Sequence, residues 1–243
     1  MKNSTTSKRK IVLSMGADAK TVKGAKLGFY TGILYLAPSA ISGYQVCPSA
    51  KLAGCEKACL YTAGRGAFNS TQKARIAKTK RFFEDRDAFM ADLIYSIGAL
   101  VRKAQRLGLT PLVRLNGTSD IAFENIKLAS GLTIFETFAG VQFYDYTKIP
   151  TRKNLPANYD LTFSYSGVES YQGLVRKALA NERLARIAVV FDKVENIPAE
   201  FMGKLVIGGD NSDVRHTEAR GTVVALYAKG QAKKDFGGFV VRA

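Results

Sequence analysis

The chain has 243 residues, 47% of them hydrophobic, and its 36 Lys and Arg against 20 Asp and Glu give a formal net charge of +16. This length and composition indicate a globular protein with one substantial core, and the lack of a run of about 20 apolar residues excludes a membrane-spanning helix. The basic excess favours a phosphate-rich partner, most commonly nucleic acid, although solubility alone would also account for such a charge.

The first segment, MKNSTTSKRK at 1–10, is polar and basic. Nothing apolar follows Met1 that could pack, so this segment is predicted to be a disordered basic tail. It also lacks the apolar stretch of a signal peptide, and we therefore expect a cytoplasmic protein. Three cysteines cannot all pair with one another, and cytosolic thiols stay reduced, so a disulfide framework is not expected.

Strands are expected next in KIVLSMG at 10–16 and KLGFYTGILYLAPS at 26–39, because both are rich in β-branched and aromatic residues and are bounded by Gly or Pro. The Gly- and Pro-containing loop at 40–69 follows and contains all three cysteines, spaced C-x7-C-x3-C. Apolar side chains at intervals of three and four predict helical structure over 70–107, with a break near EDRD at 84–87.

From residue 111 to 243, short apolar runs alternate with helix-compatible sequence or short loops. Near-continuous apolar strands indicate a parallel sheet that is buried on both faces, and helix-length connections are typical of βα units. We therefore predict one α/β domain over 11–243, built as a complete or partial parallel (β/α) barrel. An open doubly wound sheet is the alternative, and the lack of a Gly-rich nucleotide-binding fingerprint after any strand counts against it.

Polar side chains gather where the predicted strands end, and in a parallel barrel these ends converge on one mouth. Loops are polar in any protein, but Arg114 and Asn116 lie inside or at the end of an apolar run, where an unpaired charge is costly. Glycines beside the carboxylates of LNGTSD and GGDNSD would let a ligand approach the backbone closely. The candidate cofactor-binding residues are Arg114, Asn116, Ser164, Asp210, Asp213 and Arg215. The candidate catalytic residues are Asp120, Asp145, Lys148 and Lys229, with Tyr146 beside them.

The single histidine and a cluster of basic residues could each have either a functional role or an ordinary surface role. The one histidine, His216, lies in a charged loop, and a surface position is favoured over a catalytic or metal-binding role. No G-x-S-x-G elbow is present, so a Ser-His-Asp hydrolase is not expected. A basic cluster early in the helical segment is by default a solvated face, yet it is also the best local candidate for contact with a nucleic-acid backbone. Its members are Lys73, Arg75, Lys78, Lys80 and Arg81.

Three interpretations of Cys47, Cys55 and Cys59 remain open. Unreactive buried cysteines are common, but they usually scatter through a core. Zinc would need a fourth ligand, which only His216 or a carboxylate could supply. A [4Fe–4S] cluster with one open iron needs three thiols in one loop, which is the arrangement found here.

A three-cysteine loop that follows the first strands and precedes parallel βα units resembles the radical S-adenosylmethionine enzymes. In those enzymes the open iron of a [4Fe–4S] cluster binds the amine and carboxylate of S-adenosylmethionine, which is then cleaved reductively. The resemblance implies that Cys47, Cys55 and Cys59 ligate a cluster. The spacing departs from the usual C-x3-C-x2-C of that family, and no GGE-type stretch marks an amine-binding strand.

A likeness that spans roughly residues 25–243 is found in CPSAKLAGCEKACLYTAGRG, VRLNGTSDIAFE, FYDYTK, GGDNSDVR and AKG. Together these stretches resemble a bacteriophage family, the gene-88-product-like proteins. The resemblance implies a phage origin and expression in a bacterial cytoplasm, and it implies no particular activity.

The leading hypothesis from the sequence is a phage-encoded iron–sulfur enzyme of the radical S-adenosylmethionine type that acts on nucleic acid or a nucleotide. One alternative is a non-enzymatic or replication-associated DNA-binding protein whose cysteines bind zinc or are structural. The other is a divalent-metal nuclease that uses Asp120, Asp145, Asp210 and Asp213.

Overall fold

The computed structural model describes residues 9–16, 19–59, 61 and 64–242. The predicted disordered tail at 1–10 lies outside this range except for its last two residues. Of these, Arg9 lies 3.9 Å from the carboxylate of Asp92, and the Lys10 carbonyl accepts a hydrogen bond of 3.4 Å from Ser96 Oγ. Among the described residues, no helix is both long enough and apolar enough to cross a membrane.

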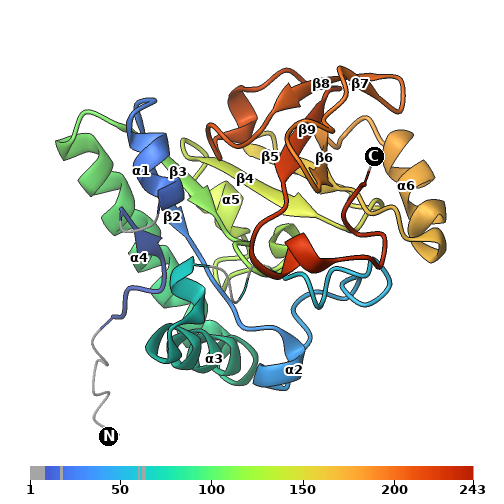
Figure 1. Ribbon diagram of the computed structural model, residues 1–243. Coiled ribbons are helices and arrows are strands. Elements are labelled where there is room, and N and C mark those ends of the chain that lie inside the picture. Colours follow the sequence, from blue (N-terminus) through green and yellow to red (C-terminus); the bar gives the residue numbers. More distant parts are fainter. Residues whose placement is uncertain (1–8, 17–18, 60, 62–63, 243) are drawn as a thin grey trace, which may run out of the picture.

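A nine-stranded sheet in the order β1-β2-β3-β4-β5-β6-β9-β8-β7 forms the centre of the molecule (Figure 1). The strands are β1 (Ser14–Met15), β2 (Phe29–Ile33), β3 (Thr110–Arg114), β4 (Gln142–Thr147), β5 (Tyr159–Ser164), β6 (Arg186–Phe191), β7 (Glu200–Phe201), β8 (Lys204–Gly208) and β9 (Val223–Tyr227). The pairings from β2 through to β8 are parallel, whereas β1 and β7 pair antiparallel at the two edges.

The prediction of one α/β domain with a mostly parallel sheet is confirmed, but a complete barrel is not formed. Closure would require the two edges of the sheet to pair, and each edge ends instead in a two-residue antiparallel strand. The first predicted strand at 10–16 is likewise reduced to Ser14–Met15, which pairs with the end of β2. The sheet is therefore open, and its parallel strands share one edge at their carboxyl ends, here called the carboxyl rim.

Helices cover both faces of the sheet. They are α1 (Ala19–Ala25), α2 (Ser39–Ser42), α3 (Asn69–Glu84), α4 (Arg86–Arg106), α5 (Ile134–Thr137) and α6 (Gln172–Leu179). The predicted break in the long helical segment falls at Asp85, whose extended φ of −143° separates α3 from α4. Gly24 of α1 lies next to Thr31, and Leu100 of α4 lies next to Gly32. Because neighbouring residues of a strand point to opposite faces, α1 and α4 cover opposite faces of β2.

Two glycines expected to open the backbone to a ligand instead make room for the protein itself. The amide of Gly117, just after β3, donates a 3.0 Å hydrogen bond to the carbonyl of Leu34. A Cβ at position 117 would lie 2.8 Å from that carbonyl oxygen and 2.7 Å from Ile33 Cγ2. At Gly209 a Cβ would lie 2.4 Å from Val224 Cγ1. Gly117 of LNGTSD and Gly209 of GGDNSD thus allow close packing at the carboxyl rim.

We expect Gly117→Ala to lower the free energy of unfolding by about 1–3 kcal/mol, because the added methyl group meets a backbone oxygen that no rotamer change can move. Urea unfolding measures the loss. Gly140→Ala is the matched control, since a Cβ at Gly140 meets no atom within 4 Å, and we expect it to change stability by less than about 0.5 kcal/mol. Equal stabilities for the two variants would contradict the tight contact after β3.

Candidate functional site at the carboxyl rim

The cysteine-containing loop runs over the carboxyl rim and is attached there by hydrogen bonds. The amide of Asp120 donates to the Val46 carbonyl at 2.7 Å, and Ser166 Oγ donates to the Ala53 carbonyl at 2.7 Å. The loop also packs against the C-terminal segment, which lies beside it in Figure 1. The buried apolar residues of that contact are Ala58, Ala228, Ala232, Phe239 and Val240. The loop is therefore placed by contacts to the ends of β3, β5 and β9.

The three thiols are half-buried, and none forms a disulfide. Cys47 Sγ lies 3.9 Å from the Thr118 carbonyl oxygen, and Cys55 Sγ lies 3.6 Å from that of Ala50. Burial raises the pKa of each thiol, and the charges of Cys55 and Cys59 add to the increase at Cys47. The thiols thus share one desolvated region, and ionisation of one opposes ionisation of the next.

Lys148 supplies a buried ammonium group near Cys47 and Cys55. Its Nζ donates to the Ser164 carbonyl at 3.0 Å, to Ser164 Oγ at 3.1 Å and to the Tyr165 carbonyl at 3.3 Å. It also lies 4.8 Å from the ring centre of Phe239. Desolvation lowers the pKa of Lys148, and negative charge at Cys55 opposes this effect. A positive group is thus positioned where thiolate charge would develop.

Asp120, a predicted catalytic residue, is the centre of a buried hydrogen-bond network. Its carboxylate accepts from Thr147 Oγ1 at 2.8 Å, from the Lys148 amide at 2.7 Å and from Arg152 Nη1 at 3.2 Å. Arg152 also forms a two-bond pair with Glu124, at 2.5 and 2.7 Å. Sequence reasoning missed Arg152, because its location in a loop after β4 suggests an exposed cation. The geometry assigns Asp120 a positioning role for the β4 end and Lys148.

We expect Asp120→Ala to lower the free energy of unfolding by about 2–4 kcal/mol, because it removes one partner of a buried ion pair and leaves the Lys148 amide without its acceptor. Chemical unfolding monitored by circular dichroism measures the change. Glu84→Ala is the control: its carboxylate accepts a solvent-exposed hydrogen bond from the Tyr44 hydroxyl, and we expect a loss below about 1 kcal/mol. A larger effect at Glu84 than at Asp120 would contradict this assignment.

Asp145 and Arg114, also predicted site residues, are buried within the sheet. The Asp145 carboxylate accepts from the amides of Leu115 and Asn116 at 3.2 and 2.9 Å and from the Tyr159 hydroxyl at 3.1 Å. Burial raises the pKa of Asp145 to about 7, and the nearby guanidinium of Arg114 opposes the increase. Asp145 therefore joins β3, β4 and β5 below the carboxyl rim.

Arg114 connects the sheet to the segment that follows β8. Its Nη1 donates to Asp213 Oδ2 at 2.8 Å, its Nε lies 3.6 Å from Asp145, and its guanidinium carbon lies 4.8 Å from the ring centre of Tyr146. Burial of the phenol raises the pKa of Tyr146. Arg114, Asp145 and Asp213, all predicted site residues, thus come together here as ion pairs with one another.

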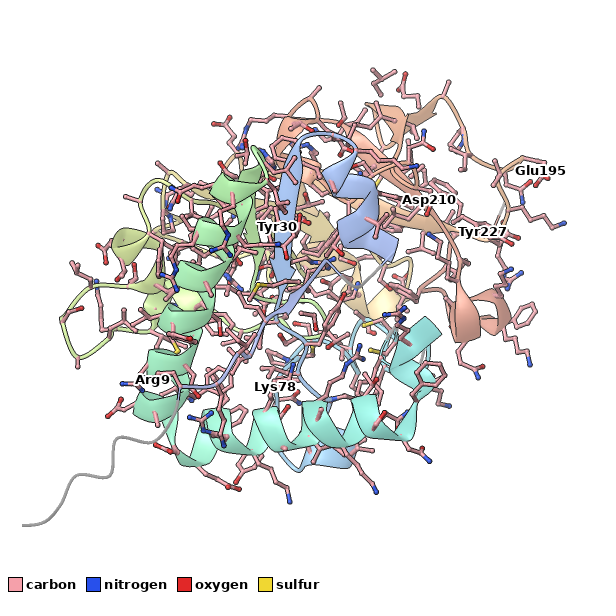
Figure 2. All side chains as sticks on the ribbon, turned by 90° about the vertical axis from the view of Figure 1, so that its left-hand side faces the viewer. Arg9, Tyr30, Lys78, Glu195, Asp210 and Tyr227 are labelled. Atoms are coloured by element: carbon pink, nitrogen blue, oxygen red, sulfur yellow. The ribbon has the colours of Figure 1, made fainter. Side chains whose placement is uncertain are left out.

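The remaining predicted residues have local partners. Asn116 Oδ1 accepts from Ser119 Oγ at 2.8 Å and from the Ile121 amide at 2.9 Å. Arg215 is fully buried and donates to the Gly209 carbonyl at 2.6 Å. Asp210 accepts from the Tyr227 amide at 2.7 Å and pairs with Lys229; Figure 2 shows Asp210 and Tyr227 beside each other. Of the predicted cofactor-binding residues, Ser164 is the one in contact with the Lys148 ammonium.

In the described part of the chain, no three His, Cys, Asp or Glu side chains are placed to hold a single metal ion. Each of the four carboxylates expected for a metal-dependent nuclease is instead next to a cationic side chain. The pairs are Asp120 with Arg152, Asp145 with Arg114, Asp210 with Lys229, and Asp213 with Arg114. The structure therefore does not bring these four carboxylates together around one point.

The basic cluster of α3 is divided between interior and surface. Arg75 is buried, donates to the Tyr61 carbonyl at 3.0 Å and lies 4.6 Å from the ring centre of Tyr35. Arg81 pairs with buried Asp92 at 2.6 Å. Lys78, labelled in Figure 2, donates to the Val12 carbonyl at 3.3 Å. Lys73 and Lys80 are exposed, so these two remain available on this helix for a phosphate backbone.

The state of Lys78 is expected to make stability depend on pH. Burial lowers its pKa to about 8 from an ordinary value of 10.5. Between these pH values the unfolded chain binds more protons than the folded one, so the contribution of Lys78 to stability rises with pH. The Lys78→Met variant lacks this increase. Between about pH 7 and about pH 10.5, its free energy of unfolding should therefore fall behind that of the unmodified protein by about 1–3 kcal/mol. Urea unfolding at both pH values checks this, with exposed Lys80→Met as the control; identical pH profiles for the two variants would count against it.

His216 is half-buried. Its ring lies 5.3 Å from that of Phe29, and desolvation lowers its pKa. It lines a cavity of about 250 Å³ at the amino ends of β5 and β6, together with Asp160, Arg186 and Glu218. This cavity lies at the opposite end of the strands from the cysteines, so His216 is not a ligand of the thiol site.

Comparison with known proteins places the chain in a family. Residues 8–243 match the family model described as Gene product 88, and the chain therefore belongs to that family. This confirms the resemblance to the gene-88-product-like bacteriophage proteins. No curated protein and no solved structure is detectably similar to the chain, so these comparisons give no support to a relation with the radical S-adenosylmethionine enzymes.

Proposed function

We propose that this member of the Gene product 88 family is an iron–sulfur enzyme whose cluster is bound at the carboxyl rim by Cys47, Cys55 and Cys59. One observation supports the proposal above the others: the chain's three thiols lie in one loop and interact electrostatically, and two of them, Cys47 and Cys55, also interact with the buried ammonium of Lys148. Scattered structural cysteines would not need this arrangement.

The number of thiols in the loop favours a cluster over a single zinc ion. Zinc requires four ligands around one point, and no such group occurs among the described side chains. In a [4Fe–4S] cluster each thiolate binds a different iron, so the three sulfurs surround the cluster without meeting at one atom. Three ligands also leave one iron open, which is where S-adenosylmethionine binds in the radical enzymes that the loop resembles.

Residues around the thiols would assist binding in defined ways. Because burial raises their pKa, the thiols are protonated without a ligand, and metal binding would release these protons. Lys148 would then offset part of the negative charge of the thiolates, and Ser164 keeps that ammonium in place. When bound, the cluster would supply the electron for reductive cleavage of S-adenosylmethionine. We propose nucleic acid or a nucleotide as the substrate, because the net charge is +16.

The experiment is reconstitution of the purified protein with iron and sulfide in the absence of oxygen. We expect a brown protein that absorbs at roughly 400 nm and contains about four irons per chain by elemental analysis. The triple variant Cys47→Ala, Cys55→Ala, Cys59→Ala should stay colourless. Lys57→Ala, an exposed change in the same loop, is the matched control and should reconstitute normally. Zinc in place of iron, or colour that persists in the triple variant, would overturn the proposal.

A DNA-binding protein without enzymatic activity is the second candidate, favoured by the same charge. Binding to arbitrary DNA that weakens steeply with salt, without cleavage of S-adenosylmethionine by the reconstituted protein, would select this candidate. Magnesium-dependent nicking that persists in the triple cysteine variant would instead select a nuclease.

A further inference from the structure

The C-terminal segment from Tyr227 to Arg242 is a basic surface at the carboxyl rim. Its cations are Lys229, Lys233, Lys234 and Arg242, and all four are exposed. Its one acidic residue, Asp235, is used internally, since its carboxylate accepts from the amides of Gly237 and Val240 at 3.1 and 2.9 Å. Of the four cations, Lys229 pairs with Asp210 and Arg242 lies 3.5 Å from Asp192, so the positive charge that the segment offers to a partner is mainly that of Lys233 and Lys234.

The same segment also carries an aromatic ring, that of Phe236, that is almost fully exposed to solvent. The side chain of Phe236 is 83% exposed, which is the largest value among the exposed large hydrophobic residues of the described chain. The guanidinium carbon of Arg242 lies 4.1 Å from the centre of this ring, and Lys233 Nζ lies 4.9 Å from the ring centre of Tyr227. An exposed aromatic ring beside cations can stack on a planar group and attract its negative charge at the same time.

Although Phe236 is exposed, the backbone around it is well attached. Phe239 and Val240 pack against the cysteine-containing loop. The Gly238 carbonyl accepts from the Gly167 amide at 2.8 Å, and the Val241 amide donates to the Val190 carbonyl at 2.8 Å. The exposed ring thus belongs to a fixed surface, which lowers the entropic cost of stacking a partner on it.

We propose that residues 227–242 form a platform for single-stranded nucleic acid, in which a base stacks on Phe236 and phosphates contact Lys233 and Lys234. Stacking on an aromatic side chain requires an exposed base face, which a single strand offers and an intact duplex does not. The proposal deepens the proposed function, since it names the surface that would hold the substrate, and it does not require the cluster.

The platform is adjacent to the candidate cluster site. Phe239 lies three residues from Phe236 in the chain, and its ring centre lies 4.8 Å from Lys148 Nζ. A strand bound at Phe236 would therefore lie at the same rim as the thiols. Lys73 and Lys80, which lie on α3, are not part of this surface.

The test measures binding of a fluorescently labelled single-stranded oligothymidine by anisotropy at low and moderate salt. Loss of one stacked base corresponds to about 1–3 kcal/mol, so Phe236→Ala should weaken binding by about 5- to 150-fold. The double variant Lys233→Ala, Lys234→Ala should weaken binding at low salt and reduce the slope of log affinity against log salt by about 1.4. Leu205→Ala, a 64% exposed apolar residue on β8, is the matched control and should bind as the unmodified protein does.

The platform would be overturned if Phe236→Ala bound the oligonucleotide as the unmodified protein does, or if Phe236→Ala and Leu205→Ala lost affinity equally. It would also be overturned if Phe236→Ala changed only the self-association of the protein, measured by sedimentation. Repeating the measurement with the triple Cys→Ala variant separates this proposal from the iron–sulfur one. Unchanged binding by that variant supports the platform whatever its metal content. A protein that forms the cluster but does not bind the oligonucleotide refutes the platform and leaves the cluster proposal intact.

Discussion

The arrangement of the carboxyl rim depends on the hydrogen bonds of one buried residue, Asp120. Its backbone amide bonds to Val46, just before the first cysteine, and its oxygens bond to Thr147 and to the Lys148 amide at the end of β4. One residue therefore sets the distance between the cysteine-containing loop and the buried ammonium. Its negative charge is tolerated in this dry environment because Arg152 and hydrogen-bond donors surround it.

The same requirement explains how the net charge is distributed. Arg114, Arg152, Arg186 and Arg215 are buried, and each contacts an Asp or Glu side chain. Because each buried pair is neutral, the net charge of +16 stays on the rest of the molecule, where fewer carboxylates remain to balance the Lys and Arg side chains. The segment 227–242 is one place where this excess reaches solvent, and there it surrounds an exposed aromatic ring.

The two proposals concern one end of the sheet but different physical environments. Lys148 and the thiols lie in a desolvated region, where charges act strongly on one another and pKa values move far from their ordinary values. Phe236 lies in water a few residues away from Phe239, which borders that region. Under the two proposals, a reactive centre would lie beside a solvated binding surface, which suits an enzyme whose polymeric substrate stays hydrated while one unit approaches the centre.

The sequence by itself determined the α/β class, the single domain, the helix break at Asp85 and the gathering of thiols in one loop, because hydrophobic spacing and local composition encode these features. Tertiary structure alone decided that the sheet stays open, since closure depends on pairing between residues far apart in the chain. It also decided which polar residues at strand ends pair internally, as Arg114 does with Asp213, and that Arg75 faces inward. The exposure of Phe236 belongs to this second group, because hydrophobicity alone predicts a buried ring, whereas the packing of Phe239 beneath the segment leaves Phe236 in solvent.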